Sequence, residues 1–84
     1  MFHKIKDVKP LPGYSLLVHF ENNEIRQYNI THLTEELEPF KPLIYVPGLF
    51  QQVKVDPGGY GISWNDEIDL ACNELYYNGV MQQA

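Results

Sequence analysis

Residues 50–70 constrain the fold more than any other stretch of this chain. They place the sequence Asp56-Pro57-Gly58-Gly59 between two runs of strand-forming residues. Proline presets the backbone of a turn, and glycine adopts the positive φ that a tight reversal requires. We therefore expect a β-hairpin whose strands are residues 50–55 and 60–64.

The segment after this hairpin is acidic at first and then helical in pattern. Asn65-Asp66-Glu67 has the composition of a turn, and residues 68–70 form a short extended piece. Residues 72–78 are long enough for about two turns of helix. We expect a short C-terminal helix there, followed by a flexible tail at residues 80–84.

A second hairpin is predicted nearer the N-terminus. Residues 14–20 alternate as a central strand does, and residues 5–9 form a short strand whose lysines suit a sheet edge. Asn22 and Asn23 tolerate the left-handed conformation, so they are expected to form a two-residue loop.

This loop sets a register in which Phe20 faces Ile25 and Leu17 faces Tyr28. Apolar pairs then lie on both faces of the hairpin. We expect either a covering element on each face or a partner molecule on one of them.

Helical structure is predicted between the two hairpins. Thr31 can cap a helix over residues 31–38, which ends before Pro39 because the residue preceding proline avoids the helical region. Residues 42–47 form either a second turn that begins at Pro42 or an apolar loop over the sheet. Since residues 43–46 are consecutive apolar residues, at least half of them are expected to be buried.

These elements predict an α+β fold. A chain of 84 residues is long enough for one domain. The predicted fold consists of an antiparallel sheet of two hairpins with an N-terminal edge strand, a helical segment between the hairpins and a short C-terminal helix. The ordered core is expected over residues 5–79. The side chains expected to build it are Trp64, Phe20, Phe50, Leu70 and Leu75.

Composition limits the classes of partner. Eleven acidic and six basic residues give a formal charge of −5, which repels a phosphate backbone. Nucleic-acid binding through Lys4, Lys6, Lys9 and Arg26 is therefore the weakest alternative. No apolar run is long enough to span a bilayer and no secretory signal is visible, so we expect a cytoplasmic protein that has no contact with membranes.

Candidate chemical sites are few. His3, His19 and His32 lack metal-ligand spacing, and the single Cys72 is expected to be a buried apolar residue. Asp66, Glu67 and Asp69 form an acidic cluster that fits a polar turn better than a calcium loop. We expect no metal, no cofactor and no enzymatic activity. The alternative is a small-ligand or metal-binding domain, or a minor enzyme, that uses Asp66, Asp69 and a histidine.

The eleven aromatic residues exceed what a domain of this size buries completely. Tyrosine and tryptophan anchor many protein interfaces. For Tyr45, Tyr76 and Tyr77, a place in the core and a place in an interface remain equally open.

The chain resembles a known family in an ordered series of residues. A strand ending in Phe20, a reversal before Arg26, the strand at residues 50–55, then Trp64, Asp69-Leu70 and Leu75-Tyr76 resemble the bacterial family called domain of unknown function 2442. The resemblance extends from about Ile5 to Gly79. It departs at Cys72-Asn73, where proline or serine often precedes the last helix.

The resemblance implies a small α+β domain without an established activity. Some relatives carry a helix-turn-helix domain after this module, and others are encoded beside a small toxin-like protein. These 84 residues include no helix-turn-helix pattern, so direct DNA binding is not expected. The resemblance suggests an antitoxin-like or regulatory role instead.

We therefore expect a non-enzymatic interaction module. Its predicted interaction residues are Asp66, Glu67, Asp69, Tyr76, Tyr77 and Tyr45. The net negative charge favours a basic partner, such as a toxin-like protein, because opposite charge speeds association. Self-association through an edge strand or through the tyrosine-bearing helix is a further expectation.

Overall fold

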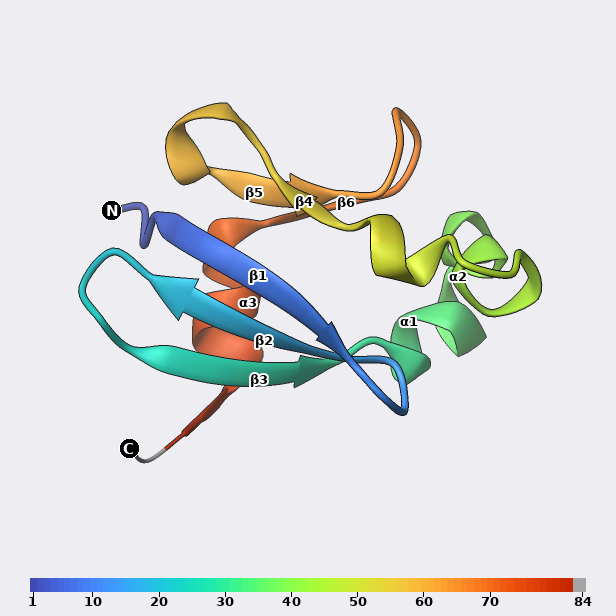
Figure 1. Ribbon diagram of the computed structural model, residues 1–84, viewed down its shortest axis with the longest axis horizontal. Helices are drawn as coiled ribbons and strands as arrows, with labels where there is room; N and C mark the ends of the chain where they lie inside the picture. Colours follow the sequence, from blue (N-terminus) through green and yellow to red (C-terminus); the bar gives the residue numbers. More distant parts are fainter. Residues whose placement is uncertain (83–84) are drawn as a thin grey trace.

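The computed structural model describes residues 1–82 and contains two antiparallel sheets. The four-stranded sheet has the order β1-β2-β3-β7, and the three-stranded sheet has the order β4-β5-β6 (Figure 1). The strands are β1 (Ile5–Leu11), β2 (Ser15–Phe20), β3 (Ile25–Asn29), β4 (Lys54–Val55), β5 (Gly61–Ser63), β6 (Asp69–Ala71) and β7 (Val80–Met81). The α+β class is confirmed, and β1 is an edge strand as predicted.

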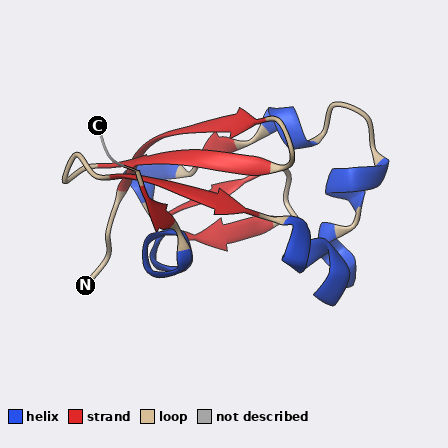
Figure 2. Cartoon of the chain, turned by 90° about the horizontal axis from the view of Figure 1, so that it is seen from below, coloured by secondary structure: helices blue, strands red, loops and turns tan. Residues whose placement is uncertain are grey.

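In the sequence, the helical elements occur between the strands. They are α1 (Thr31–Glu36), α2 (Pro42–Tyr45), α3 (Cys72–Asn78) and the 3-10 turns η1 (Glu38–Phe40), η2 (Phe50–Gln52) and η3 (Pro57–Gly59). Figure 2 shows helical turns gathered at the end of the molecule away from both termini. The strands and α3 fill the other part of the fold (Figure 1 and Figure 2).

The expected single sheet is wrong, because the hairpins belong to separate sheets. Residues 50–52 form η2, so β4 keeps only two residues. The indole Nε1–H of Trp64 donates to the carbonyl oxygen of Phe50 at 3.0 Å. This bond engages the Phe50 carbonyl and holds Phe50 in a turn, with its ring buried. A strand over residues 50–55 is therefore shortened from its start.

The two-residue loop in the first hairpin is also wrong. His19 pairs with Ile25 and Leu16 with Tyr28, which differs by one residue from the predicted register. Of the two asparagines, only Asn23 has a positive φ, of 72°. The Asn22 side chain instead accepts a hydrogen bond from the Glu24 N–H at 2.9 Å. A longer loop results, and a shift of one residue moves every side chain of β3 to the other face.

The corrected register sorts the core onto one face of the four-stranded sheet. Leu16, Val18, Phe20 and Tyr28 point inward and are buried. They pack with residues from the three-stranded sheet and α3, among them Ile62, Trp64, Cys72 and Leu75. Of the predicted core residues, Phe20, Phe50, Trp64 and Leu75 are buried, and Leu70 is partly buried against them.

The predicted helix over residues 31–38 ends at Glu36, and a second turn does begin at Pro42. Within residues 43–46 only Leu43 is buried, so the expectation that half of them are buried is wrong. A four-residue helix has one side toward the core, and Leu43 occupies it. The other three side chains are left at the surface.

The C-terminal helix has the predicted bounds, and the segment after it is more ordered than expected. Val80–Met81 pairs with β3, and the Gln82 N–H donates to the Ile25 carbonyl at 2.8 Å. Residues 83–84 of the predicted tail lie outside the described residues. Among residues 1–82, no helix is long and apolar enough to cross a bilayer.

Candidate functional site

The charges of the chain are divided unevenly between two parts of the molecule. Residues 31–48 and 65–69 contain six of the eleven carboxylates but only one basic side chain, Lys41, which accounts for the whole formal charge of −5. The carboxylates are Glu35, Glu36, Glu38, Asp66, Glu67 and Asp69, and all six residues are exposed. Elsewhere, five carboxylates and five basic side chains cancel.

Buried aromatic side chains bring these two segments to one end of the fold. The indole ring of Trp64 lies 6.4 Å from the ring of Phe40 and 6.2 Å from the ring of Phe50. Trp64 thereby joins the start of the β5–β6 loop to η1 and η2. Figure 1 shows this loop and α2 in the half of the molecule away from the N-terminus. We call residues 31–48 and 65–69 the acidic end.

The β5–β6 loop is a structured turn. The Asn65 side-chain oxygen accepts hydrogen bonds from the backbone N–H groups of Glu67 and Ile68, at 2.8 and 3.0 Å. The Trp64 N–H donates to the Ile68 carbonyl at 3.0 Å. The predicted turn at residues 65–67 is therefore confirmed, and Asp66 and Glu67 project into solvent from a fixed backbone.

Apolar side chains are exposed among the carboxylates. Tyr45 is 71% exposed, and Leu37, Ile44 and Val46 are 45%, 37% and 47% exposed. Exposed apolar groups rimmed by charge are a common property of protein-interaction surfaces. The acidic end combines both features.

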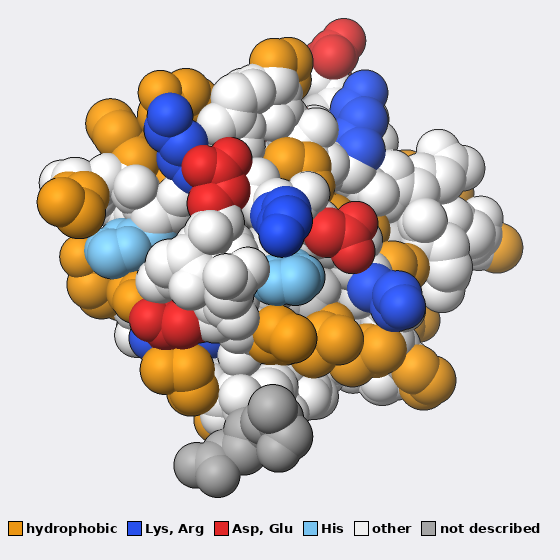
Figure 3. All heavy atoms as spheres, turned by 60° about the vertical axis from the view of Figure 1, so that its left-hand side comes forward, with side chains coloured by type: hydrophobic (Ala, Val, Ile, Leu, Met, Phe, Trp, Pro, Cys, Tyr) orange, Lys and Arg blue, Asp and Glu red, His pale blue; other side chains and the backbone are white. Residues whose placement is uncertain are grey.

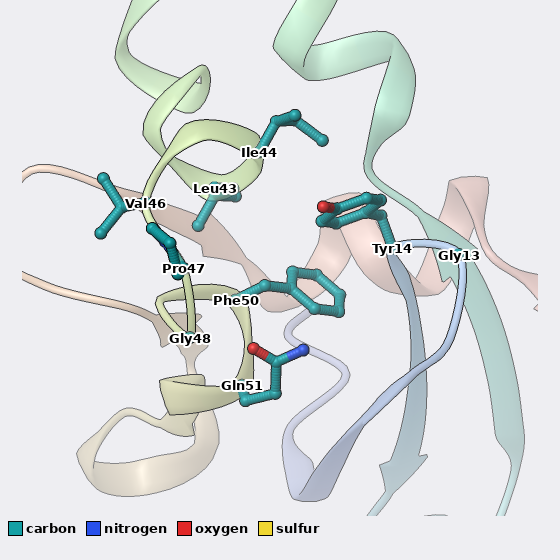
Figure 4. Close-up of a pocket in the computed structure, with 9 residues that line it drawn as sticks. All are labelled: Gly13, Tyr14, Leu43, Ile44, Val46, Pro47, Gly48, Phe50 and Gln51. Carbon is teal, nitrogen blue, oxygen red and sulfur yellow. The ribbon is translucent and has the colours of Figure 1, made fainter.

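Two shallow hollows flank Ile44. One, of about 280 Å³, lies between the β1–β2 turn and the segment from α2 to η2. Figure 4 shows Phe50 and Tyr14 pointing toward each other there, with Ile44 and Gln51 on either side. The other, of about 360 Å³, is lined by Thr34, Glu35, Lys41, Ile44 and Tyr45. These volumes lie at the low end of the range for small-molecule pockets, and each hollow has room for a side chain of a partner.

Most carboxylates of the acidic end are available to a partner. Among these six carboxylates, only that of Glu38 forms an ion pair within residues 1–82, with Lys41 at 2.8 Å. The hydrogen bond and charge of Glu38 raise the pKa of Lys41. The surface can therefore accept ammonium or guanidinium groups around an apolar centre.

The predicted interaction residues divide between two regions. Asp66, Glu67, Asp69 and Tyr45 belong to the acidic end, whereas Tyr76 and Tyr77 lie on α3. Sequence reasoning missed Glu35, Glu36, Glu38, Ile44 and Val46. The sequence signal for the three glutamates was the excess of acid in residues 31–38. For Ile44 and Val46 it was the apolar run at residues 43–46, of which at least half was expected to be buried.

The comparisons with known proteins agree with the series of residues described above. A family model described as Protein of unknown function (DUF2442) matches residues 5–80. The chain belongs to this family. Neither a curated protein nor a solved structure matches the chain. The family description names no activity, so any functional argument rests on the surfaces of the molecule.

The two tyrosines of α3 have different surroundings. The Tyr76 ring stacks on His3 at a centroid distance of 3.6 Å, and the Arg26 guanidinium lies 4.0 Å from the same ring. At these distances the two groups occupy opposite faces. The Tyr76 hydroxyl donates to Glu24 at 2.8 Å, and this bond, with that from Arg26, lowers the pKa of Glu24. Tyr77 is 65% exposed.

A third polar cluster lies where β3 meets α1 and α3. The Tyr28 hydroxyl donates to Glu74 at 2.8 Å and lies 3.3 Å from Nε2 of His32. Burial, followed by the hydrogen bond to Glu74, raises the pKa of Tyr28 well above its usual range. Tyr28 therefore stays protonated at neutral pH, which suits a structural bond and does not suit a general base.

The remaining reactive groups do not converge. Cys72 is buried, His3 contacts Tyr77, and His19 lies on the outer face of β2 opposite Ile25. Within residues 1–82, no three His, Cys, Asp or Glu side chains are placed to share a metal ion. Arg26 is held between Glu24 and Tyr76.

Proposed function

We propose that this chain is a protein-interaction module whose acidic end binds a basic partner protein. The observation that carries the proposal is that the whole net charge and four exposed apolar side chains occur at the same end. Complementary charge steers a basic partner toward this surface, and the apolar side chains supply contact area that excludes water. A small toxin-like protein is one such partner, which would give the chain an antitoxin-like or regulatory role.

The proposal assigns no reaction to the chain. The one thiol is buried, and the tyrosine with the perturbed pKa remains protonated. The hollows beside Ile44 have room for one apolar and one basic side chain of a partner, with Glu35 in the second hollow. Recognition by such a pair of side chains requires no cofactor.

Two tyrosines make a matched pair of variants for the test. Tyr45 is 71% exposed at the acidic end, and Tyr77 is 65% exposed on α3. The C-terminally tagged chain is used to capture its partner from the native host, and the affinity of the purified pair is then measured by calorimetry. Tyr45→Ser should weaken binding by about tenfold or more, whereas Tyr77→Ser should change it by less than about twofold.

Charge reversal provides a second arm. Glu35→Lys combined with Glu67→Lys should weaken binding and flatten its dependence on salt, because both carboxylates are exposed at the acidic end. Asp7→Lys, on the outer face of β1, is the control. An acidic partner, or a partner lost with Tyr77→Ser and kept with Tyr45→Ser, would contradict the proposal.

A further inference from the structure

A second exposed apolar surface lies at the opposite end of the molecule. Met1 is fully exposed, Phe2 and Tyr77 are each 65% exposed, and Tyr60 is 49% exposed. Figure 3 shows hydrophobic side chains gathered around a histidine on this side. We call Met1, Phe2, Tyr60 and Tyr77 the aromatic patch. It belongs to the part of the chain whose charges cancel.

The patch is held in a fixed shape. The Asn73 side chain accepts from the His3 N–H at 3.0 Å and donates to the Met1 carbonyl at 2.9 Å. The Phe2 ring meets the Tyr60 ring edge-on at 5.3 Å. Because these contacts already order the N-terminal segment, docking on it would cost little conformational entropy.

A groove of about 550 Å³ adjoins the exposed Phe2 ring. Phe2, His3, Lys4, Phe20 and Glu21 are among its walls. A projecting aromatic ring and a hollow of suitable chemistry therefore lie side by side on one surface. An interface between two identical copies related by a twofold axis requires this property, because the same surface of both copies forms the contact and must be complementary to itself.

The charges of the groove have the same self-complementary arrangement. Lys4 and Glu21 are neighbours, because the Glu21 N–H donates to the Lys4 carbonyl at 2.9 Å. Neither side chain forms an ion pair within the part of the chain that the structure describes. Across a twofold axis, Lys4 of one copy can meet Glu21 of the other, and the reverse pair forms by symmetry.

We propose that the aromatic patch is the interface of a homodimer, in which Phe2 of each copy enters the groove of the other and Lys4 pairs with Glu21 across the interface. The acidic end is the poorer choice for this contact, because two copies would each bring a charge of −5 there. In the dimer both acidic ends remain free. This inference concerns a surface distinct from the one that binds the basic partner.

The first test is the oligomeric state of the purified chain, carrying a C-terminal tag so that Met1 remains free. Sedimentation velocity over about 10–300 µM should show a dimer that forms with increasing concentration. Phe2→Ser should weaken dimerisation by at least about tenfold, whereas Tyr45→Ser should leave it unchanged. A wild-type chain that stays monomeric throughout overturns the proposal and leaves the patch to a different protein.

The second test exchanges the charges. Lys4→Glu and Glu21→Lys should each weaken the dimer, because each substitution places two like charges opposite each other in both symmetry-related pairs. The double variant keeps the net charge of the chain and should restore the dimer to within about threefold of the wild type. Circular dichroism establishes that each variant is folded. A double variant no better than the single ones, or a dimer broken by Tyr45→Ser, would refute the assigned interface.

Discussion

The acidic end and the aromatic patch are both exposed apolar surfaces, but they are supported in different ways. At the acidic end, the segments that bear the exposed side chains are joined by buried rings, above all Trp64 packed between Phe40 and Phe50. At the aromatic patch, support comes from contacts between partly exposed side chains, such as His3 stacked on Tyr76. Buried rings therefore support the acidic end, and contacts between side chains at the surface support the aromatic patch.

This difference separates stability from recognition. The carboxylates of the acidic end are largely unpaired, so they can be replaced without loss of a hydrogen bond. Around the aromatic patch, Glu24, Arg26 and Tyr76 bond to one another, and the loss of one affects the others. We therefore expect substitutions in the acidic end to affect binding, and substitutions beside the aromatic patch to affect folding as well.

The largest effect is predicted for the ring beneath the acidic end. Trp64 is only 4% exposed, so Trp64→Ala should lower the free energy of unfolding by about 3–5 kcal/mol. Urea unfolding followed by circular dichroism measures the change. Tyr45→Ser, at the exposed surface of the acidic end, should cost less than about 0.5 kcal/mol. An equal loss of unfolding free energy in the two variants would mean that Trp64 does not support the acidic end.

An intermediate effect is predicted for α3. Tyr76→Ala removes the ring between His3 and Arg26 and should cost about 2 kcal/mol, since a stacked pair and a cation–π contact are both lost. Tyr77→Ala, one residue along the helix, should cost markedly less because the ring is mostly exposed. Thermal unfolding of both variants checks the order. A larger loss for Tyr77→Ala would reverse our assignment of these two side chains.

The smallest effect is a pH dependence beside the aromatic patch. The folded pKa of Glu24 lies below its usual value of 4.5, chiefly because the Tyr76 hydroxyl donates to it and Arg26 is adjacent. This stabilisation is fully present above pH 4.5 and is lost as the pH falls through the folded pKa. Tyr76→Phe should reduce this loss in unfolding midpoints measured from about pH 6 to pH 3, and Tyr77→Phe should not.

The fold could be predicted where local chemistry decides it. Gly58 and Gly59 both have positive φ in the predicted turn, and α3 has the predicted bounds of residues 72–78. The register of the first hairpin could not be predicted, because Asn22 serves as a side-chain acceptor and only Asn23 enters the left-handed region. The pair Asn22-Asn23 is compatible both with the predicted two-residue loop and with the longer loop that the structure shows.

The sequence predicted the kinds of residue in the candidate site, acidic and aromatic, but not which residues come together there. Tyr45, Asp66 and Glu67 were predicted as interaction residues, and the segments that carry them lie in the same half of the molecule (Figure 1). Glu35, some thirty residues before Asp66 in the sequence, joins them only because Trp64 links the loop to η1 and η2. Such an association depends on tertiary packing, which residue spacing does not encode.

The hydrogen bond between His3 and Asn73 spans 70 positions of sequence, which determines when it can form during synthesis. Ribosomes add about 5–20 residues per second, so Asn73 is made roughly 4–14 s after His3. The first hairpin is complete long before that moment. During this interval the N-terminal rings have no helix to rest on, and they are open to chaperones or to another nascent chain.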